Sequence, residues 1–168
     1  VRDAARRGAQ IICLKELFNA QYFCKAQECD RFDLAEPIPG PTTERMQAIA
    51  RELQVVVIVP LFERQTAGIY RNSAAVIDAD GSLLGVYRKM HNPFEWPYFN
   101  PGEDTPVAEA PVGNLASVIC YDFCFPELMR VYALKGAEAI LVSTAWPMTG
   151  HERDDDYSGW AMDLAAQS

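Results

Sequence analysis

The sequence predicts an α/β fold in which helices cover one face of each sheet. Apolar, β-branched runs such as residues 55–60 alternate along the chain with segments of helical spacing such as residues 42–53, and this alternation is typical of layered α/β folds. A short internal repeat supports the prediction. RRGAQIICL near the start and LKGAEAILV near the end both run from an expected helix end through Gly-Ala into an apolar strand. We therefore expect two similar α–β units. No linker separates them, so we predict a single domain over residues 1–168.

In the first half of the chain, turn and cap signals separate the expected elements. Residues 2–7 are expected to form a helix that stops at Gly8, since glycine commonly ends helices. Residues 17–43 contain aromatic residues and a Pro-Gly-Pro cluster, which predicts an irregular loop. The helix after this loop is expected to be capped by Thr42 or Thr43. The expected strands of this half are residues 10–14, 55–60 with an extension to 65, 72–77 and 82–88.

The second half is organised around LASVICYDFCFPE, residues 115–127. This stretch predicts a buried strand, a sharp bend at Cys120 and a helix that opens at Pro126, because proline suits the first helical turn. A thiol at the end of a rigid strand is a common arrangement for a nucleophilic cysteine. The proline-rich residues 90–113 predict a long loop, which in a compact domain is usually functional. The other expected elements are the helix 126–135, the strand 138–143 and a helix over residues 154–168.

Composition excludes several classes of function. The chain has 168 residues, of which 49% are hydrophobic and 23% charged, as in ordinary soluble globular proteins. Its net charge of −8 argues against nucleic acid or an anionic membrane surface as a partner. No apolar run is long enough for a membrane span, and the N-terminus does not have the pattern of a signal peptide. The five cysteines are therefore expected to be reduced thiols of a cytoplasmic protein.

Three ionisable side chains stand where apolar strands are expected to end. Glu16, Lys89 and Cys120 each lie at or just after such an end, which places them at the rim of a sheet, where α/β proteins bind ligands. Together they would form an acyl-transfer set. The thiolate attacks a carbonyl carbon, the ammonium stabilises the thiolate and the oxyanion, and the carboxylate moves the proton. This chemistry needs no cofactor.

Each of these residues also has a structural interpretation. A cysteine in an apolar strand is more often a core residue than a nucleophile, and Glu16 and Lys89 taken singly are typical of solvated loop charges. Cys120 and Cys124 are alternatively a thiol redox pair, although their spacing is not C-x-x-C. His91 is expected to be a structural hydrogen-bonding residue. Neither histidine of the chain pairs with a cysteine at metal-ligand spacing, so no metal site is expected.

Six stretches occur in an order that matches a known family. They are GAQIICLKELF, EPIPGPTT, YRNSAAVIDADGSLLGVYRKMH, EWPYFNPGED, VICYDFCFPELMR and LKGAEAILVSTAWP. In this pattern, which covers nearly the whole chain, the protein resembles the nitrilase superfamily of carbon–nitrogen hydrolases. The resemblance implies a four-layer-type α-β-β-α sandwich that assembles into a homodimer or a higher homo-oligomer.

The resemblance also implies roles for individual residues. The family's catalytic Glu, Lys and Cys correspond to Glu16, Lys89 and Cys120, the residues already singled out. A second family glutamate supports the lysine, and it corresponds to Glu95 in EWPYFNPG. The oxyanion hole implied consists of the Lys89 ammonium and the backbone N–H of Tyr121.

The sequence around the cysteine also indicates a branch of the family. CYD followed by FPE resembles the amidase and N-carbamoyl amine hydrolase branches. The function implied is a thiol hydrolase that releases ammonia from a small linear amide or N-carbamoyl amine through a cysteine thioester. A nitrile hydrolase is the alternative within the superfamily. Trp146 is expected to line the substrate pocket, with core packing as an equally open interpretation.

Two departures from the family pattern motivate a further hypothesis. Lys15 stands where the family usually has proline, and a cation there would lower the pKa of Glu16 if its side chain pointed inward. The family's first strand and its C-terminal part are absent, so we expect the chain to be part of a longer protein. A non-catalytic remnant is therefore a third hypothesis. It predicts that Glu16, Lys89 and Cys120 do not converge on one pocket.

Overall fold

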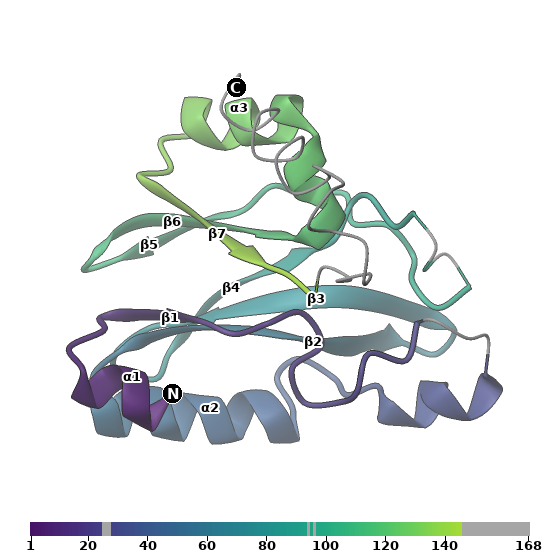
Figure 1. The fold of residues 1–168 in the computed structure, drawn as a ribbon, viewed down its shortest axis with the longest axis horizontal. Helices are drawn as coiled ribbons and strands as arrows, with labels where there is room; N and C mark the ends of the chain where they lie inside the picture. Colours follow the sequence, from purple (N-terminus) through teal and green to yellow (C-terminus); the bar gives the residue numbers. More distant parts are fainter. Residues whose placement is uncertain (25–27, 94, 96, 146–168) are drawn as a thin grey trace, which may run out of the picture.

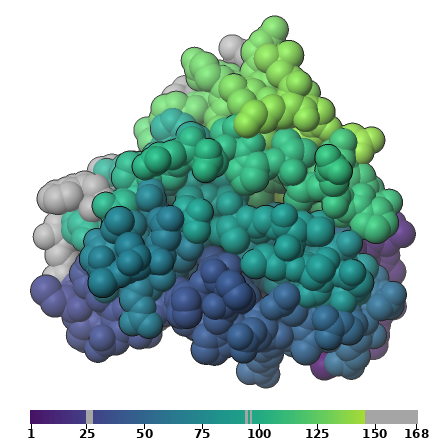
Figure 2. Space-filling model, turned by 180° about the vertical axis from the view of Figure 1, so that it is seen from behind, coloured from purple at the N-terminus to yellow at the C-terminus, as the bar shows by residue number. Residues whose placement is uncertain are grey.

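The computed structural model describes residues 1–24, 28–93, 95 and 97–145, and these residues form two β-sheets packed face to face between outer helices (Figure 1). Helices α1 (Arg2–Arg6) and α2 (Pro41–Leu53) cover the outer face of the larger sheet, and α3 (Pro126–Leu134) covers the smaller sheet. The expected α-β-β-α sandwich is therefore confirmed. From behind, the purple and blue N-terminal segments form one side of the sandwich and the green to yellow segments the other (Figure 2).

The strands of the described residues are β1 (Ile11–Cys13), β2 (Val56–Thr66), β3 (Ile69–Ile77), β4 (Leu83–Arg88), β5 (Val107–Ala110), β6 (Gly113–Ile119) and β7 (Ala139–Ser143). The larger sheet has the order β1-β2-β3-β4 and the smaller one the order β5-β6-β7. β1 is parallel to β2 and β7 is parallel to β6, whereas the other neighbours are antiparallel. Two short 3-10 helices are also formed, η1 (Cys29–Leu34) and η2 (Cys120–Cys124).

The two similar α–β units expected from the sequence are α1 with β1 and α3 with β7. Gly8 and Gly136 stand between helix and strand with φ of +90° and +85°, a left-handed conformation in which glycine readily ends a helix. Each strand then lies at the edge of its sheet and runs parallel to its neighbour. β1 and β7 are in contact across the sandwich. Residues that follow these two strands are consequently brought to the same end of the molecule.

β2 shows why the larger sheet has a continuous apolar strand. Val56 and Ile58 face the interior between the two sheets, where they pack in one core with residues of β6. Val57 and Val59 face the opposite way and pack with Ala50 of α2. A strand buried on both faces needs apolar residues at every position rather than at alternate ones. Burying each such side chain contributes about 1.5–3 kcal/mol. β2 therefore stabilises the larger sheet, in which β1 leads to Glu16 and β4 leads to Lys89.

Three details differ from the sequence predictions. β5 lies inside residues 90–113, which were expected to be loop; the prolines that flank this short edge strand conceal it. Neither threonine caps α2. Pro41 is its first residue, Gly40 is the cap, and Thr43 accepts a hydrogen bond from the Gly40 N–H at 2.8 Å. β3 begins at Ile69, three residues earlier than expected. The predicted helix over residues 154–168 lies outside the described residues.

No helix within the described part of the chain combines the length and the apolar character that crossing a membrane requires.

Candidate active site

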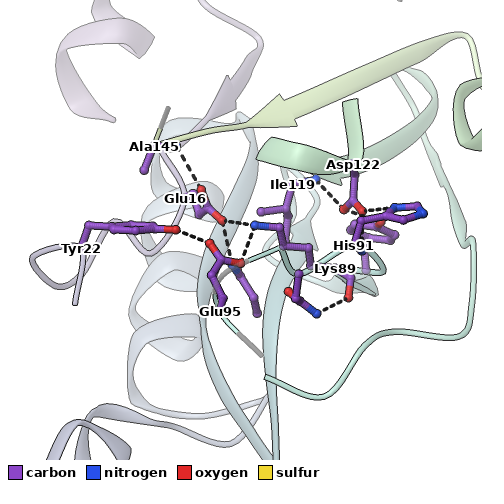
Figure 3. Close-up of polar contacts among 11 residues, drawn as sticks. Glu16, Tyr22, Lys89, His91, Glu95, Ile119, Asp122 and Ala145 are labelled. Carbon is purple, nitrogen blue, oxygen red and sulfur yellow. Dashed lines mark hydrogen bonds and ion pairs between the residues drawn. The ribbon is translucent and has the colours of Figure 1, made fainter. Parts of the chain in front are cut away.

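The three side chains singled out in the sequence meet at one end of the two sheets. Glu16 follows β1, Lys89 follows β4 and Cys120 follows β6. The Lys89 ammonium donates a hydrogen bond to Glu16 Oε1 at 2.8 Å (Figure 3), and the Cys120 thiol lies near enough to the Glu16 carboxylate for that carboxylate to raise its pKa. The hypothesis of a non-catalytic remnant predicted that these side chains would not converge. The direct contact of Lys89 with Glu16 counts against that hypothesis.

Glu16 is completely buried and is held by donors on both of its oxygens. Oε1 accepts from Lys89 Nζ and from Asn72 Nδ2, each at 2.8 Å. Oε2 accepts the backbone N–H of Ala145, which follows β7, at 3.2 Å (Figure 3). Two donors occupy the lone pairs of Oε1. Oε2 is therefore the oxygen with room for a proton from Cys120.

Lys89 lies between two carboxylates. Besides Glu16, its ammonium contacts Glu95 Oε2 at 2.7 Å, and its side chain is completely buried. Burial alone lowers the pKa of Lys89, but the charges and hydrogen bonds of Glu16 and Glu95 raise it above its ordinary value. The lysine is therefore held as an ammonium ion, in the position that would stabilise a neighbouring negative charge.

The pKa of the Glu95 carboxyl group is subject to opposing effects. Its side chain is nearly completely buried, and this burial raises its pKa, which the negative charge of Glu16 raises further. The positive charge of Lys89 and hydrogen bonds from Lys89 and Tyr22 act in the opposite direction. Glu95 thus shares one cation, the Lys89 ammonium, with Glu16.

Cys120 sits on a strained turn. Its φ is +49°, a conformation that costs a non-glycine residue about 1–3 kcal/mol, and it starts η2 directly where β6 ends. Burial raises the pKa of the Cys120 thiol to about 12, with the charge of Glu16 acting in the same direction and Lys89 and Thr144 opposing it. The thiol is therefore protonated at neutral pH, and it needs a base to become a nucleophile.

Asp122 holds this turn in place. Its fully buried carboxylate accepts the Tyr87 hydroxyl at 2.7 Å and the backbone N–H groups of Ile119 and His91 at 3.2 and 2.9 Å (Figure 3). The His91 ring, which stacks on Phe125 with centroids 3.6 Å apart, adds a hydrogen bond at 2.8 Å from Nδ1. His91 is thus the structural hydrogen-bonding residue that the sequence predicted.

Three further residues of the site were not singled out from the sequence. Tyr22 donates its hydroxyl to Glu95, Asn72 donates to Glu16, and the Cys24 thiol lies near both carboxylates. Burial raises the pKa of Cys24, and the charges of Glu95 and Glu16 raise it further, so this second thiol is also protonated at neutral pH. Asn72 lies within the quoted stretch YRNSAAVIDADGSLLGVYRKMH, whereas Tyr22 and Cys24 lie between the first two quoted stretches.

The remaining predicted residues have different outcomes. The Tyr121 N–H lies in the first turn of η2, where a helix leaves N–H groups without an internal partner. Lys15 is exposed, whereas Glu16 beside it is buried, so the lysine side chain does not point into the site. Trp146 lies outside the described residues. All five cysteines are free thiols. Within the part of the chain that the structure describes, no three His, Cys, Asp or Glu side chains group as metal ligands.

Comparison with known proteins identifies the family. The model of the family "Carbon-nitrogen hydrolase" matches residues 1–162. The chain belongs to the carbon–nitrogen hydrolase family. N-carbamoylputrescine amidase of Solanum lycopersicum is 45% identical over 163 residues, which cover 93% of this chain and 53% of that protein. This chain thus spans about half the length of the curated relatives it matches.

Solved structures agree with this assignment. The carbon–nitrogen hydrolase from Helicobacter pylori G27 has a TM-score of 0.91 at 33% identity, covering 99% of this chain and 60% of that one. An amidase mutant from Nesterenkonia sp. AN1, with the acetamide moiety of fluoroacetamide covalently added at its active site cysteine, has a TM-score of 0.74 at 27% identity. That match covers 98% of this chain and 62% of the amidase chain. The resemblance to the nitrilase superfamily is therefore confirmed.

Proposed function

We propose that this protein is a thiol hydrolase that cleaves a C–N bond of a small linear amide or N-carbamoyl amine and releases ammonia through a covalent cysteine intermediate. The observation that carries the proposal is the buried chain of contacts Glu95–Lys89–Glu16 that ends at the Cys120 thiol. The tomato relative, an N-carbamoylputrescine amidase, supports the substrate class. The Nesterenkonia amidase, which carries its adduct on a cysteine, supports a cysteine nucleophile.

In the first half of the reaction, the thiol is acylated. Glu16 takes the proton of Cys120 as the sulfur attacks the carbonyl carbon, and the carbonyl oxygen becomes an oxyanion. The Lys89 ammonium and the Tyr121 N–H stabilise that oxyanion. Glu16 then gives its proton to the leaving nitrogen, the C–N bond breaks, and ammonia leaves a thioester on Cys120.

In the second half, water releases the acyl group. Glu16 removes a proton from the attacking water, the second tetrahedral oxyanion forms at the same place, and the C–S bond breaks as Cys120 recovers its proton. An amide thus yields an acid and ammonia. Throughout, Glu95 keeps Lys89 in place. The Cys-Lys-Glu set supplies the nucleophile, the charge and the base, so the proposed reaction needs no cofactor.

The test is ammonia release from four substrate classes: N-carbamoyl amines, ω-amides, aliphatic amides and nitriles. We expect release from the first three, and Cys120→Ala and Cys120→Ser should each abolish it. Cys124→Ala is the matched control and should retain most of the activity, because Cys124 is buried beside Asp122 and not beside Glu16. Equal loss at both cysteines would favour the thiol redox alternative instead. Release from nitriles alone would favour a nitrile hydrolase.

We also propose that the protein is cytoplasmic and acts as a homodimer or a higher homo-oligomer. Its five free thiols suit a reducing compartment. Leu134 and Val131 of α3 are 79% and 39% exposed, and exposed apolar side chains on one helix face favour a second protein surface over water. Light scattering on the eluate of a sizing column gives the mass of the assembly and tests this point.

A further inference from the structure

Tyr22 reaches the site from a different side than the other residues. It belongs to the segment that follows β1, and its ring extends toward Glu95, which Lys89 approaches from the opposite direction (Figure 3). The Tyr22 hydroxyl donates to Glu95 Oε1, while Lys89 Nζ donates to Oε2 at 2.7 Å. Each carboxylate oxygen of Glu95 therefore has its own donor, one neutral and one charged.

The backbone on both sides of this contact is anchored. Phe23, next to Tyr22, is buried with its ring centroid 5.2 Å from that of Phe62 and 5.2 Å from that of Tyr98. The backbone N–H of Tyr98 in turn donates to the Glu95 carbonyl at 2.9 Å. One aromatic cluster thus carries both the Tyr22 segment and the backbone of Glu95. The phenol is held in position before any substrate arrives.

We propose that Tyr22 is a positioning residue that keeps the Glu95 carboxylate turned toward Lys89, so that the ammonium stays fixed beside the reacting carbonyl. The inference rests on the proposed function and adds a residue to it. Without the hydroxyl, Glu95 Oε1 would lose its donor in a site from which water is largely excluded, and a buried carboxylate with one donor fewer rotates or takes up a proton. Either change releases Lys89 from one of its two partners.

The electrostatic surroundings of Glu95 set the expected pH dependence. Within the described part of the chain, the ionisable groups that face it are Lys89, Glu16, Tyr22 and the Cys24 thiol. Burial raises the pKa of Glu95, and the negative charge of Glu16 raises it further. Lys89 and the Tyr22 hydroxyl lower it. Removing the hydroxyl therefore raises this pKa. Activity that needs ionised Glu95 is lost as pH falls through that pKa, so the acid limb of the pH profile moves to higher pH.

The experiment compares Tyr22→Phe with Tyr70→Phe. Tyr70 belongs to the same aromatic cluster and is also partly buried, with its ring against Phe32 and Phe62. For ammonia release at pH 7, we expect Tyr22→Phe to lower kcat about tenfold with little change in KM, and to shift the acid limb upward. In a Glu95→Gln background, Tyr22→Phe should have less than about a twofold further effect, because its target is already gone.

A second measurement does not depend on turnover. In protein labelled with ¹³C at glutamate carboxyl groups, the NMR signal that disappears in Glu95→Gln belongs to Glu95. Its titration midpoint should rise in Tyr22→Phe and stay unchanged in Tyr70→Phe. The role of Tyr22 would be overturned if the Glu95 titration midpoint stayed unchanged in Tyr22→Phe. It would also be overturned if the loss of kcat in the Tyr22→Phe/Glu95→Gln double variant equalled the product of the two single losses. Absence of ammonia release from the wild type, or its survival in Cys120→Ala, would overturn the proposed function instead.

Discussion

Replacing Asp122 by asparagine tests whether this carboxylate holds the turn that carries Cys120. Asp122 Oδ1 accepts the backbone N–H of His91, and Oδ2 accepts that of Ile119. Asparagine has a single acceptor oxygen, so in either orientation of its amide one of these two N–H groups faces an NH₂ group. The Tyr87 hydroxyl can rotate and become an acceptor, but a backbone N–H cannot.

The magnitude follows from this count. An unpaired buried N–H costs about 1–3 kcal/mol, and hydrogen bonds to a charged acceptor are stronger than those to a neutral one by about 1 kcal/mol. We therefore expect Asp122→Asn to lower the free energy of unfolding by about 2–4 kcal/mol. Equilibrium urea denaturation measures the change, and ammonia release should fall in parallel because the Cys120 turn is no longer held.

Asp80→Asn is the matched control for this experiment. Asp80 is an exposed turn residue whose Oδ1 accepts the Ser82 N–H at 2.7 Å, and an asparagine oxygen can accept the same bond. This variant should unfold at the wild-type urea concentration. If Asp122→Asn also unfolded there, the carboxylate would not hold the turn and the reasoning would be refuted.

Two further predictions concern the loop after Lys89 and the thiol itself. A Cβ on Gly102 would lie 2.0 Å from the Arg88 carbonyl oxygen, so Gly102→Ala should displace the loop and reduce ammonia release more than tenfold. Gly85→Ala is the control: its Cβ would meet nothing within 4 Å, so this variant should keep its ammonia release. Because the pKa of Cys120 is raised to about 12, its alkylation by iodoacetamide, followed by mass spectrometry, should keep accelerating above pH 9. A plateau near pH 8.5, as for a free thiol, would contradict that.

Short-range sequence patterns predicted much of the fold. The continuous apolar run of β2 and the Gly-Ala steps after α1 and α3 are short-range signals, and the elements formed where these signals stand. The predicted ends of strands, which bear Glu16, Lys89 and Cys120, were likewise visible in the sequence. By contrast, β5 was missed, because a short edge strand depends on pairing with a neighbour more than on its own composition. The start of β3, an inner strand, was placed three residues too late.

By itself, the sequence determined which residues are able to carry acyl-transfer chemistry and which family they belong to. Only the tertiary structure decided which oxygen of Glu16 is open to the thiol, that Asp122 anchors the turn, and that Tyr22 and Asn72 complete the site. The physical reason is distance along the chain: Asn72 and Glu16 are 56 residues apart, and Tyr22 and Glu95 are 73 apart. Such contacts depend on how β1, β3 and β4 are aligned in one sheet, and no local pattern encodes that alignment.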